Sequence, residues 1–220
     1  LQNGTALASG YIHDNYQGQL GHWGLPPTVF QGVNEFHLIS QVWDEKNTTL
    51  NLRDTGSHQT RRRRRSLANA PHFAKAFAGI KSTILLDSEG HLWATGSNSR
   101  GQLCLGDDID RMIPERVPLT ERIADVSIGG KHTLLLDEKG SVYGCGSNTH
   151  RQLGLGKKRL AVFGPTKLEG MRSPVLSISS GHRHSILMTK DAIYFMGSNK
   201  YGQLCADTGG EGVSTPTAVN

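Results

Sequence analysis

Short runs of hydrophobic residues recur along the chain, separated by polar turns that contain glycine. Residues 83–96 consist of an apolar run, a polar turn and a second run with Trp93 near its centre. The same pattern returns at residues 133–146 and, one residue shorter, at residues 185–197. Short apolar runs bounded by turn residues are typical of β-strands, so each copy predicts a β-hairpin.

A polar motif, Asn-x-x-x-Gln-Leu, follows each hairpin. It begins at Asn98, Asn148 and Asn199, in steps of 50 and 51 residues, and a further copy begins at Asn15. Such a fixed period is the sequence signature of a repeat architecture. We therefore expect each copy of the motif to occupy the same place in a repeated unit.

Two more strands are expected in every period. Downstream of each motif, Pro-x-x-Val or Pro-x-x-Leu marks the start of a strand, where the missing N–H of proline costs little. A short apolar run then ends at a glycine turn, at Gly79, Gly129 and Gly181. Four short strands in about 50 residues predict one blade of a β-propeller. The fold class is therefore all-β, a β-propeller of four-stranded blades.

Single positions of the repeat have expected structural roles. Glycine ends a strand just before the Ser-Asn corner, which predicts a positive φ or a close backbone approach at Gly96, Gly146 and Gly197. The leucine of each polar motif is expected to pack between adjacent blades, at Leu103, Leu153 and Leu204.

Composition agrees with many short strands and tight turns. The chain has 27 glycines in 220 residues, well above the usual share of about 7%. The formal net charge is +5, and residues 61–65 are five consecutive arginines, so the rest of the chain is neutral. A nucleic-acid interaction would therefore depend on this arginine run.

Candidate chemistry is sparse. The three cysteines, Cys104, Cys145 and Cys205, are far apart and form no C-x-x-C pair, which argues against a disulfide framework and a zinc site. A reducing intracellular compartment fits this pattern. His182 and His184 are interpreted as turn residues, so no metal site is expected. No catalytic or dinucleotide-binding motif and no membrane-length apolar run is present, so we expect no enzyme activity, no cofactor and no membrane span.

The segment Gly129-Gly-Lys-His-Thr, the later Gly-Ser-Asn148 and Gln-Leu-Gly154 resemble repeats of the regulator of chromosome condensation family. The resemblance implies a seven-bladed propeller. Because 220 residues hold only about four repeats, the ring is expected to be incomplete within residues 1–220. The first repeat is too long, which predicts an insertion at about residues 31–70.

The resemblance and the insertion suggest three functions. We expect a non-catalytic, protein-interaction propeller, such as a scaffold or a subunit of a larger assembly. The first alternative is guanine-nucleotide exchange on a small GTPase, or its regulation, which is an activity known in this family. The second is chromatin or RNA binding through the arginine run. The candidate partner contacts lie in the insertion: Phe36, Trp43, Arg61, Arg62, Arg63, Arg64 and Arg65.

Overall fold

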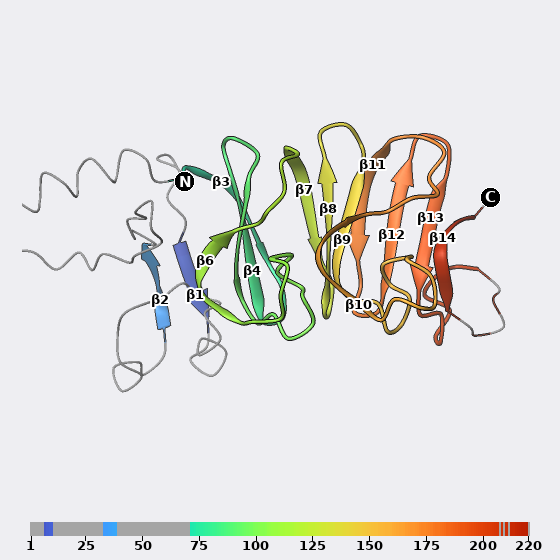
Figure 1. Ribbon diagram of the computed structural model, residues 1–220, viewed down its shortest axis with the longest axis horizontal. Helices are drawn as coiled ribbons and strands as arrows, with labels where there is room; N and C mark the ends of the chain where they lie inside the picture. The colour runs from blue at the N-terminus through green and yellow to red at the C-terminus, as the bar shows by residue number, and fades with distance from the viewer. Residues whose placement is uncertain are drawn as a thin grey trace, which may run out of the picture.

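β-Strands are the only regular secondary structure in the described part of the chain. The computed structural model describes residues 7–10, 33–38, 71–206, 208, 210 and 212–219. These ranges contain no helix, and so none that could cross a membrane. Their strands are shown in Figure 1 and are β1 (Leu7–Gly10), β2 (Val33–Leu38), β3 (Phe73–Ala78), β4 (Ser82–Asp87), β5 (Leu92–Gly96), β6 (Arg111–Arg116), β7 (Ile123–Ile128), β8 (His132–Asp137), β9 (Val142–Ser147), β10 (Ala161–Lys167), β11 (Val175–Ser180), β12 (His184–Thr189), β13 (Ile193–Gly197) and β14 (Val213–Val219).

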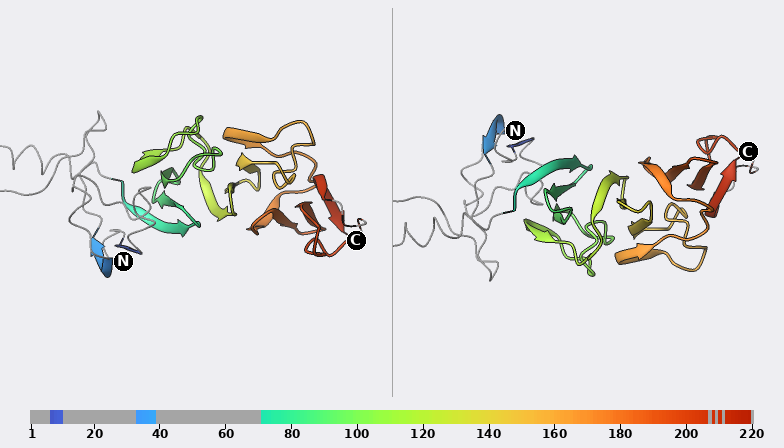
Figure 2. Two further views of the ribbon diagram at one scale, coloured as in Figure 1. Left: turned by 90° about the horizontal axis from the view of Figure 1, so that it is seen from below. Right: turned by 90° about the horizontal axis from the view of Figure 1, so that it is seen from above.

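Strands β3 to β14 form three four-stranded antiparallel sheets. Within each sheet, neighbours along the chain pair with each other, in the orders β3-β4-β5-β6, β7-β8-β9-β10 and β11-β12-β13-β14. The three sheets stand side by side as consecutive blades (Figure 2), and the first strands β3, β7 and β11 form contacts between blades. The predicted fold class is confirmed, and the blades form an open arc of a propeller ring.

A fourth, two-stranded sheet pairs β1 with β2. Gly10 lies opposite Val33, as Gly96 lies opposite Arg111 between β5 and β6. The segment assigned to the insertion therefore begins with a strand, β2, that pairs as the outer strand of a blade does. The remainder of residues 31–70, apart from this strand, lies outside the described residues.

The three downstream prolines occupy a different place from the one expected. Pro114 and Pro165 lie within the outer strands β6 and β10 rather than at their starts, and Pro216 lies within β14. Proline is tolerated there because each outer strand is paired on one side only. The pairing also shifts register around the proline: opposite β6, for example, the shift lies between Ala94 and Gly96 of β5.

The hydrophobic core lies between blades. One cluster joins Ile84 and Leu92 of the first blade to Val126 and Leu135 of the second, and Leu103 packs within it. A second cluster joins Leu134 and Val142 of the second blade to Leu187 and Met196 of the third, with Leu153 inside it. Leu103, Leu153 and Leu204 are all fully buried. Stacking of the sheets therefore buries the apolar faces that one sheet alone would leave exposed.

The Asn-x-x-x-Gln-Leu motif builds the corner between the third and fourth strands. The asparagine Oδ1 accepts a hydrogen bond from the backbone N–H of the leucine, at 2.9 Å in each of the three described copies. The glutamine Oε1 accepts from the N–H two residues earlier, at 2.8–2.9 Å. One asparagine and one glutamine thus close the loop in every blade, at Asn98, Asn148 and Asn199.

Both the backbone angle and the available space require glycine before each corner. The φ angles of Gly96, Gly146 and Gly197 are 106°, 97° and 108°, which side chains other than glycine rarely adopt. A Cβ at each position would also lie 2.5 Å from the carbonyl oxygen of Lys81, Lys131 or Arg183. Only glycine therefore allows the end of the third strand of a blade to approach the turn between the first and second strands so closely.

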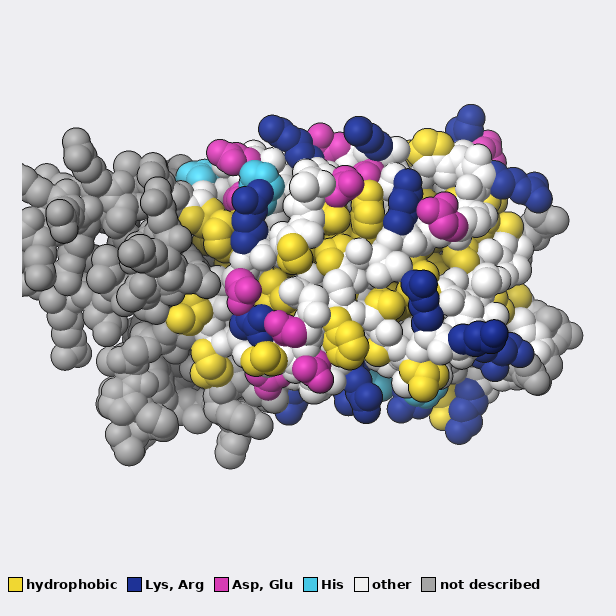
Figure 3. All heavy atoms as spheres, in the orientation of Figure 1, with side chains coloured by type: hydrophobic (Ala, Val, Ile, Leu, Met, Phe, Trp, Pro, Cys, Tyr) yellow, Lys and Arg dark blue, Asp and Glu magenta, His cyan; other side chains and the backbone are white. Residues whose placement is uncertain are grey.

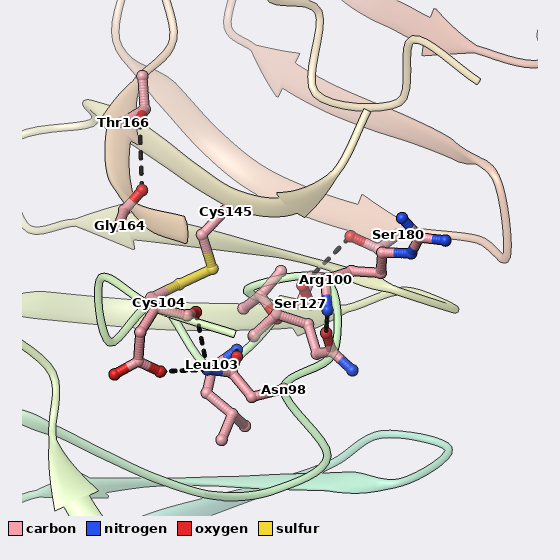
Figure 4. The surroundings of a disulfide bond; sticks show 12 residues. Asn98, Arg100, Leu103, Cys104, Ser127, Cys145, Gly164, Thr166 and Ser180 are labelled. Carbon is pink, nitrogen blue, oxygen red and sulfur yellow. Dashed lines mark hydrogen bonds between the residues drawn. A yellow bond between two sulfur atoms is a disulfide. The ribbon is translucent and has the colours of Figure 1, made fainter. Parts of the chain in front are cut away.

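A disulfide joins the first two blades and corrects one expectation from sequence. Cys104, in the corner loop after β5, is bonded to Cys145 in β9, with a Cα–Cα distance of 5.3 Å (Figure 4). The two cysteines are 41 positions apart in the sequence, and the stacking of consecutive repeats brings them together. The cysteines therefore no longer support a reducing compartment. The third cysteine, Cys205, is an exposed free thiol.

Candidate binding pocket on the turn face

One end of the blades carries the β7–β8 and β11–β12 turns together with the corner loops, and we call this end the turn face. A pocket of about 230 Å³ opens on it. Arg100 comes from the corner loop of the first blade, Lys131 from the β7–β8 turn, and Arg183 from the β11–β12 turn. Residues of three consecutive blades therefore meet at one place.

The rest of the pocket, hereafter the basic pocket, comes from the second corner loop and the third blade. Ser147 and Gln152 are only 4% and 2% exposed and form its floor. Thr149, His150 and His182 complete the lining. In Figure 3 the lower edge of the molecule, where these turns lie, shows Lys and Arg side chains with histidines among them.

Close contact between two turns fixes the pocket's shape. A Cβ added to Gly130 would lie 2.3 Å from Cδ2 of His182, and one added to Gly129 would lie 2.7 Å from the carbonyl oxygen of Gly181. The β7–β8 turn therefore packs directly on the β11–β12 turn, with backbone against the imidazole. The absence of a side chain at Gly130 leaves room for the imidazole of His182.

A chain of hydroxyl groups positions the second histidine. Ser147 Oγ and Thr149 Oγ1 are 3.0 Å apart, and Thr149 Oγ1 lies 3.1 Å from His150 Nδ1. The backbone N–H of His150 donates to Gln152 Oε1 at 2.9 Å. The His150 ring is therefore held through Nδ1 and its own backbone.

The positive charge of the basic pocket is not neutralised within the described residues. No carboxylate lines it, and none forms an ion pair with Arg100, Lys131 or Arg183. Burial lowers the pKa of His150, and the charges of Arg183 and His182 lower it further. Among the described arginines, Arg111 does form ion pairs, with Asp107 at 2.6 Å and with Glu115 at 2.5 Å.

A third histidine lies behind the pocket, in the core. His132 Nε2 is 2.9 Å from Ser185 Oγ, and Ser185 Oγ donates to the carbonyl oxygen of Gln152 at 2.7 Å. Because the serine proton is used there, Nε2 must be the donor and Nδ1 stays unprotonated, without a partner. Burial, with the charges of His184 and His182, lowers the pKa of His132 to about 3.

The structure places the residues predicted from sequence in separate regions. Phe36 belongs to β2, whereas Trp43 and the arginine run at residues 61–65 lie outside the described residues. Gly79, Gly129 and Gly181 lie at the turns between first and second strands, as expected from the repeat. Within the described ranges no group of three or more His, Cys, Asp or Glu residues is arranged to hold a metal ion.

Sequence reasoning missed the basic pocket. The repeat pattern gives Lys131 and Arg183 equivalent places in two turns and no binding role. The available signal was the basic residue at the same register of each described turn, since Lys81 matches these two. Each such residue directly precedes the second strand of a blade, which places its side chain on the turn face.

Meander sheets stacked as blades around one axis, with loops and turns gathered at their ends, define a β-propeller repeat protein. The family model of the regulator of chromosome condensation (RCC1) repeat matches residues 89–136 and 139–188, and a second model of the same repeat matches residues 123–152. The chain carries repeats of the regulator of chromosome condensation family.

Relatives of known identity share these repeats. The ultraviolet-B receptor UVR8 of Arabidopsis thaliana is 37% identical over 131 residues, which are 58% of this chain and 30% of the receptor. The human regulator of chromosome condensation is 28% identical over 158 residues, 68% of this chain and 37% of that protein. The chain therefore spans well under half the length of these relatives.

Solved structures show the same fold. Yeast RCC1 (Prp20) bound to Kap60 matches with a TM-score of 0.75 at 20% identity, covering 99% of this chain and 45% of that one. Prp20p of Saccharomyces cerevisiae, described with its binding to Gsp1p and histones, matches with a TM-score of 0.74 at 19% identity, covering 98% and 46%.

Proposed function

We propose that this chain is a non-catalytic protein-interaction propeller and that the turn face is its binding surface. The observation that carries the proposal is the basic pocket, in which cations from three consecutive blades line one cavity and form no ion pair among the described residues. Permanent charges left unpaired at the mouth of a pocket are suited to an acidic group from another molecule. A scaffold or a subunit of a larger assembly would use such a surface.

A photo-crosslinking amino acid at Thr149, which is exposed at the pocket, tests this proposal. The control places the same group at Lys139, which is exposed in the β8–β9 turn at the opposite end of the blades. We expect a defined protein adduct in cell extract from position 149, detected by mass spectrometry, and none of the same mass from position 139. Equal adducts from both positions would show that the turn face is not the binding surface.

Guanine-nucleotide exchange on a small GTPase is the second candidate. The observation in its favour is the shared fold with Prp20p, which was described together with its binding to Gsp1p and histones. This chain covers 46% of that protein, so exchange activity would require surfaces that these residues supply by themselves. Release of a fluorescent guanine nucleotide from a panel of small GTPases, with and without the chain, is the direct assay. Unchanged release rates across the panel would exclude the activity for residues 1–220.

A further inference from the structure

The composition of the basic pocket indicates what kind of group it takes. Three permanent cations, Arg100, Lys131 and Arg183, surround a floor of Ser147 and Gln152. Guanidinium groups bind the oxygens of phosphate and carboxylate in forked geometry, and an ammonium acts as a point charge. The imidazole N–H groups of His150 and His182 add further donors. A small anion with several oxygens can use all of these together.

The shape of the pocket distinguishes between sources of that anion. Nucleic acid presents singly charged phosphates at regular intervals, and proteins bind it with cations spread along a groove or stripe. Here the cations converge on one cavity of about 230 Å³. A single compact anion carrying close to two charges matches this arrangement better than a strand of diesters does.

A carboxylate uses the pocket less completely than a phosphate does. It carries one charge and two oxygens, whereas a phosphorylated side chain carries about −1.5 to −2 charges at pH 7 and three acceptor oxygens. The pocket offers three permanent cations and two imidazoles, and the hydroxyls of Ser147 and Thr149 orient one of these imidazoles. The number and variety of donors therefore correspond to a phosphomonoester.

The site is also organised in advance. The backbone of Gly130 packs closely on the imidazole of His182, and the hydroxyl chain from Ser147 orients the imidazole of His150. Little ordering is then needed when the anion binds, which favours affinity. We propose that the basic pocket binds the phosphomonoester of a phosphorylated serine or threonine on a protein partner. The inference rests on the protein-binding role proposed above, because it names the group that the partner presents.

The test is a titration of the complete chain with inorganic phosphate, followed by NMR shifts of the histidine ring protons. The variants are Lys131→Gln and Arg183→Gln, and Lys139→Gln is the control with the same loss of charge at the opposite turn. We expect phosphate to shift the His150 and His182 signals in the wild type. Each pocket variant should bind phosphate at least tenfold more weakly, and the control should bind as the wild type does.

Competitors identify the source of the anion. A phosphoserine peptide should displace phosphate at lower concentration than either its glutamate counterpart or a thymidine oligonucleotide. Equal loss of binding in Lys139→Gln, equal competition by the glutamate peptide, or stronger competition by the oligonucleotide would overturn the proposal. If phosphate does not bind but crosslinking from position 149 still captures a partner, the protein-binding role stands and the ligand class is wrong.

Discussion

Among single residues, His132 links the stability of the blades to pH. Its pKa is about 3 in the folded chain, against about 6.5 for an unperturbed histidine. Between these values the unfolded chain binds a proton that the folded chain does not, so stability falls as the pH drops below about 6.5. The expected slope from this group is about 1.4 kcal/mol per pH unit. Urea unfolding between pH 4.5 and 6.5 measures it.

The matched variant for this prediction is His132→Gln. Its unfolding free energy should depend less on pH over the same range, by roughly the slope that His132 contributes. Burial also lowers the pKa values of His150 and His184. Both residues are present in the wild type and in His132→Gln, so their contributions cancel when the two pH profiles are compared. Identical pH profiles would show that His132 does not titrate as the buried geometry requires.

Sequence could identify some residues and not others for physical reasons. Gly96, Gly146 and Gly197 were recognisable because a positive φ restricts the choice to glycine in every repeat. The Cys104–Cys145 bond was not, because it joins a corner loop to the next blade and occurs in one repeat pair only. The basic pocket is hidden for a similar reason, since its walls come from three repeats that the sequence separates by about fifty residues each.

At the level of elements, the disulfide fastens the first corner loop to strand β9. Closing a loop of this length stabilises a fold by about 2–4 kcal/mol, chiefly through the unfolded chain. Reduction, or the change Cys145→Ser, should therefore lower the unfolding free energy by about that amount. The control is Cys205→Ser, which removes the exposed free thiol and should leave stability unchanged. A wild type whose denaturation is insensitive to reductant would contradict the bond.

At the scale of the whole molecule, the third blade has an apolar face without a neighbour among the described residues. Met188 and Ile193 are 44% and 43% exposed, whereas the equivalent Leu136 and Val142 of the second blade are 5% and 0% exposed, packed against the third. Leu136→Ala should therefore cost about 2–5 kcal/mol, and Met188→Ala about 1 kcal/mol or less. Chemical denaturation of both variants measures the difference. A large cost at Met188 would mean that another blade or a second copy covers this face in solution.

The arginine run gives a prediction about binding rather than stability. Replacement of residues 61–65 by alanine should leave the melting temperature nearly unchanged and weaken binding to an acidic partner, most clearly at low salt, where screening is least. The measurement is a titration of the wild-type and five-alanine chains against the partner captured by crosslinking, at two salt concentrations. Equal affinities at both concentrations would assign binding to the turn face alone.

One side-chain hydrogen bond between blades recurs at the same register of the repeat. Thr133 donates to the carbonyl oxygen of Gln102, and Ser185 donates in the same way to that of Gln152. Each corner is thus secured by a hydroxyl of the unit that follows it. Because donor and acceptor recur at one register, duplication of a single unit supplies every new junction with both groups at once. A chain of this kind can therefore lengthen or shorten by whole units without losing the bond that joins one blade to the next.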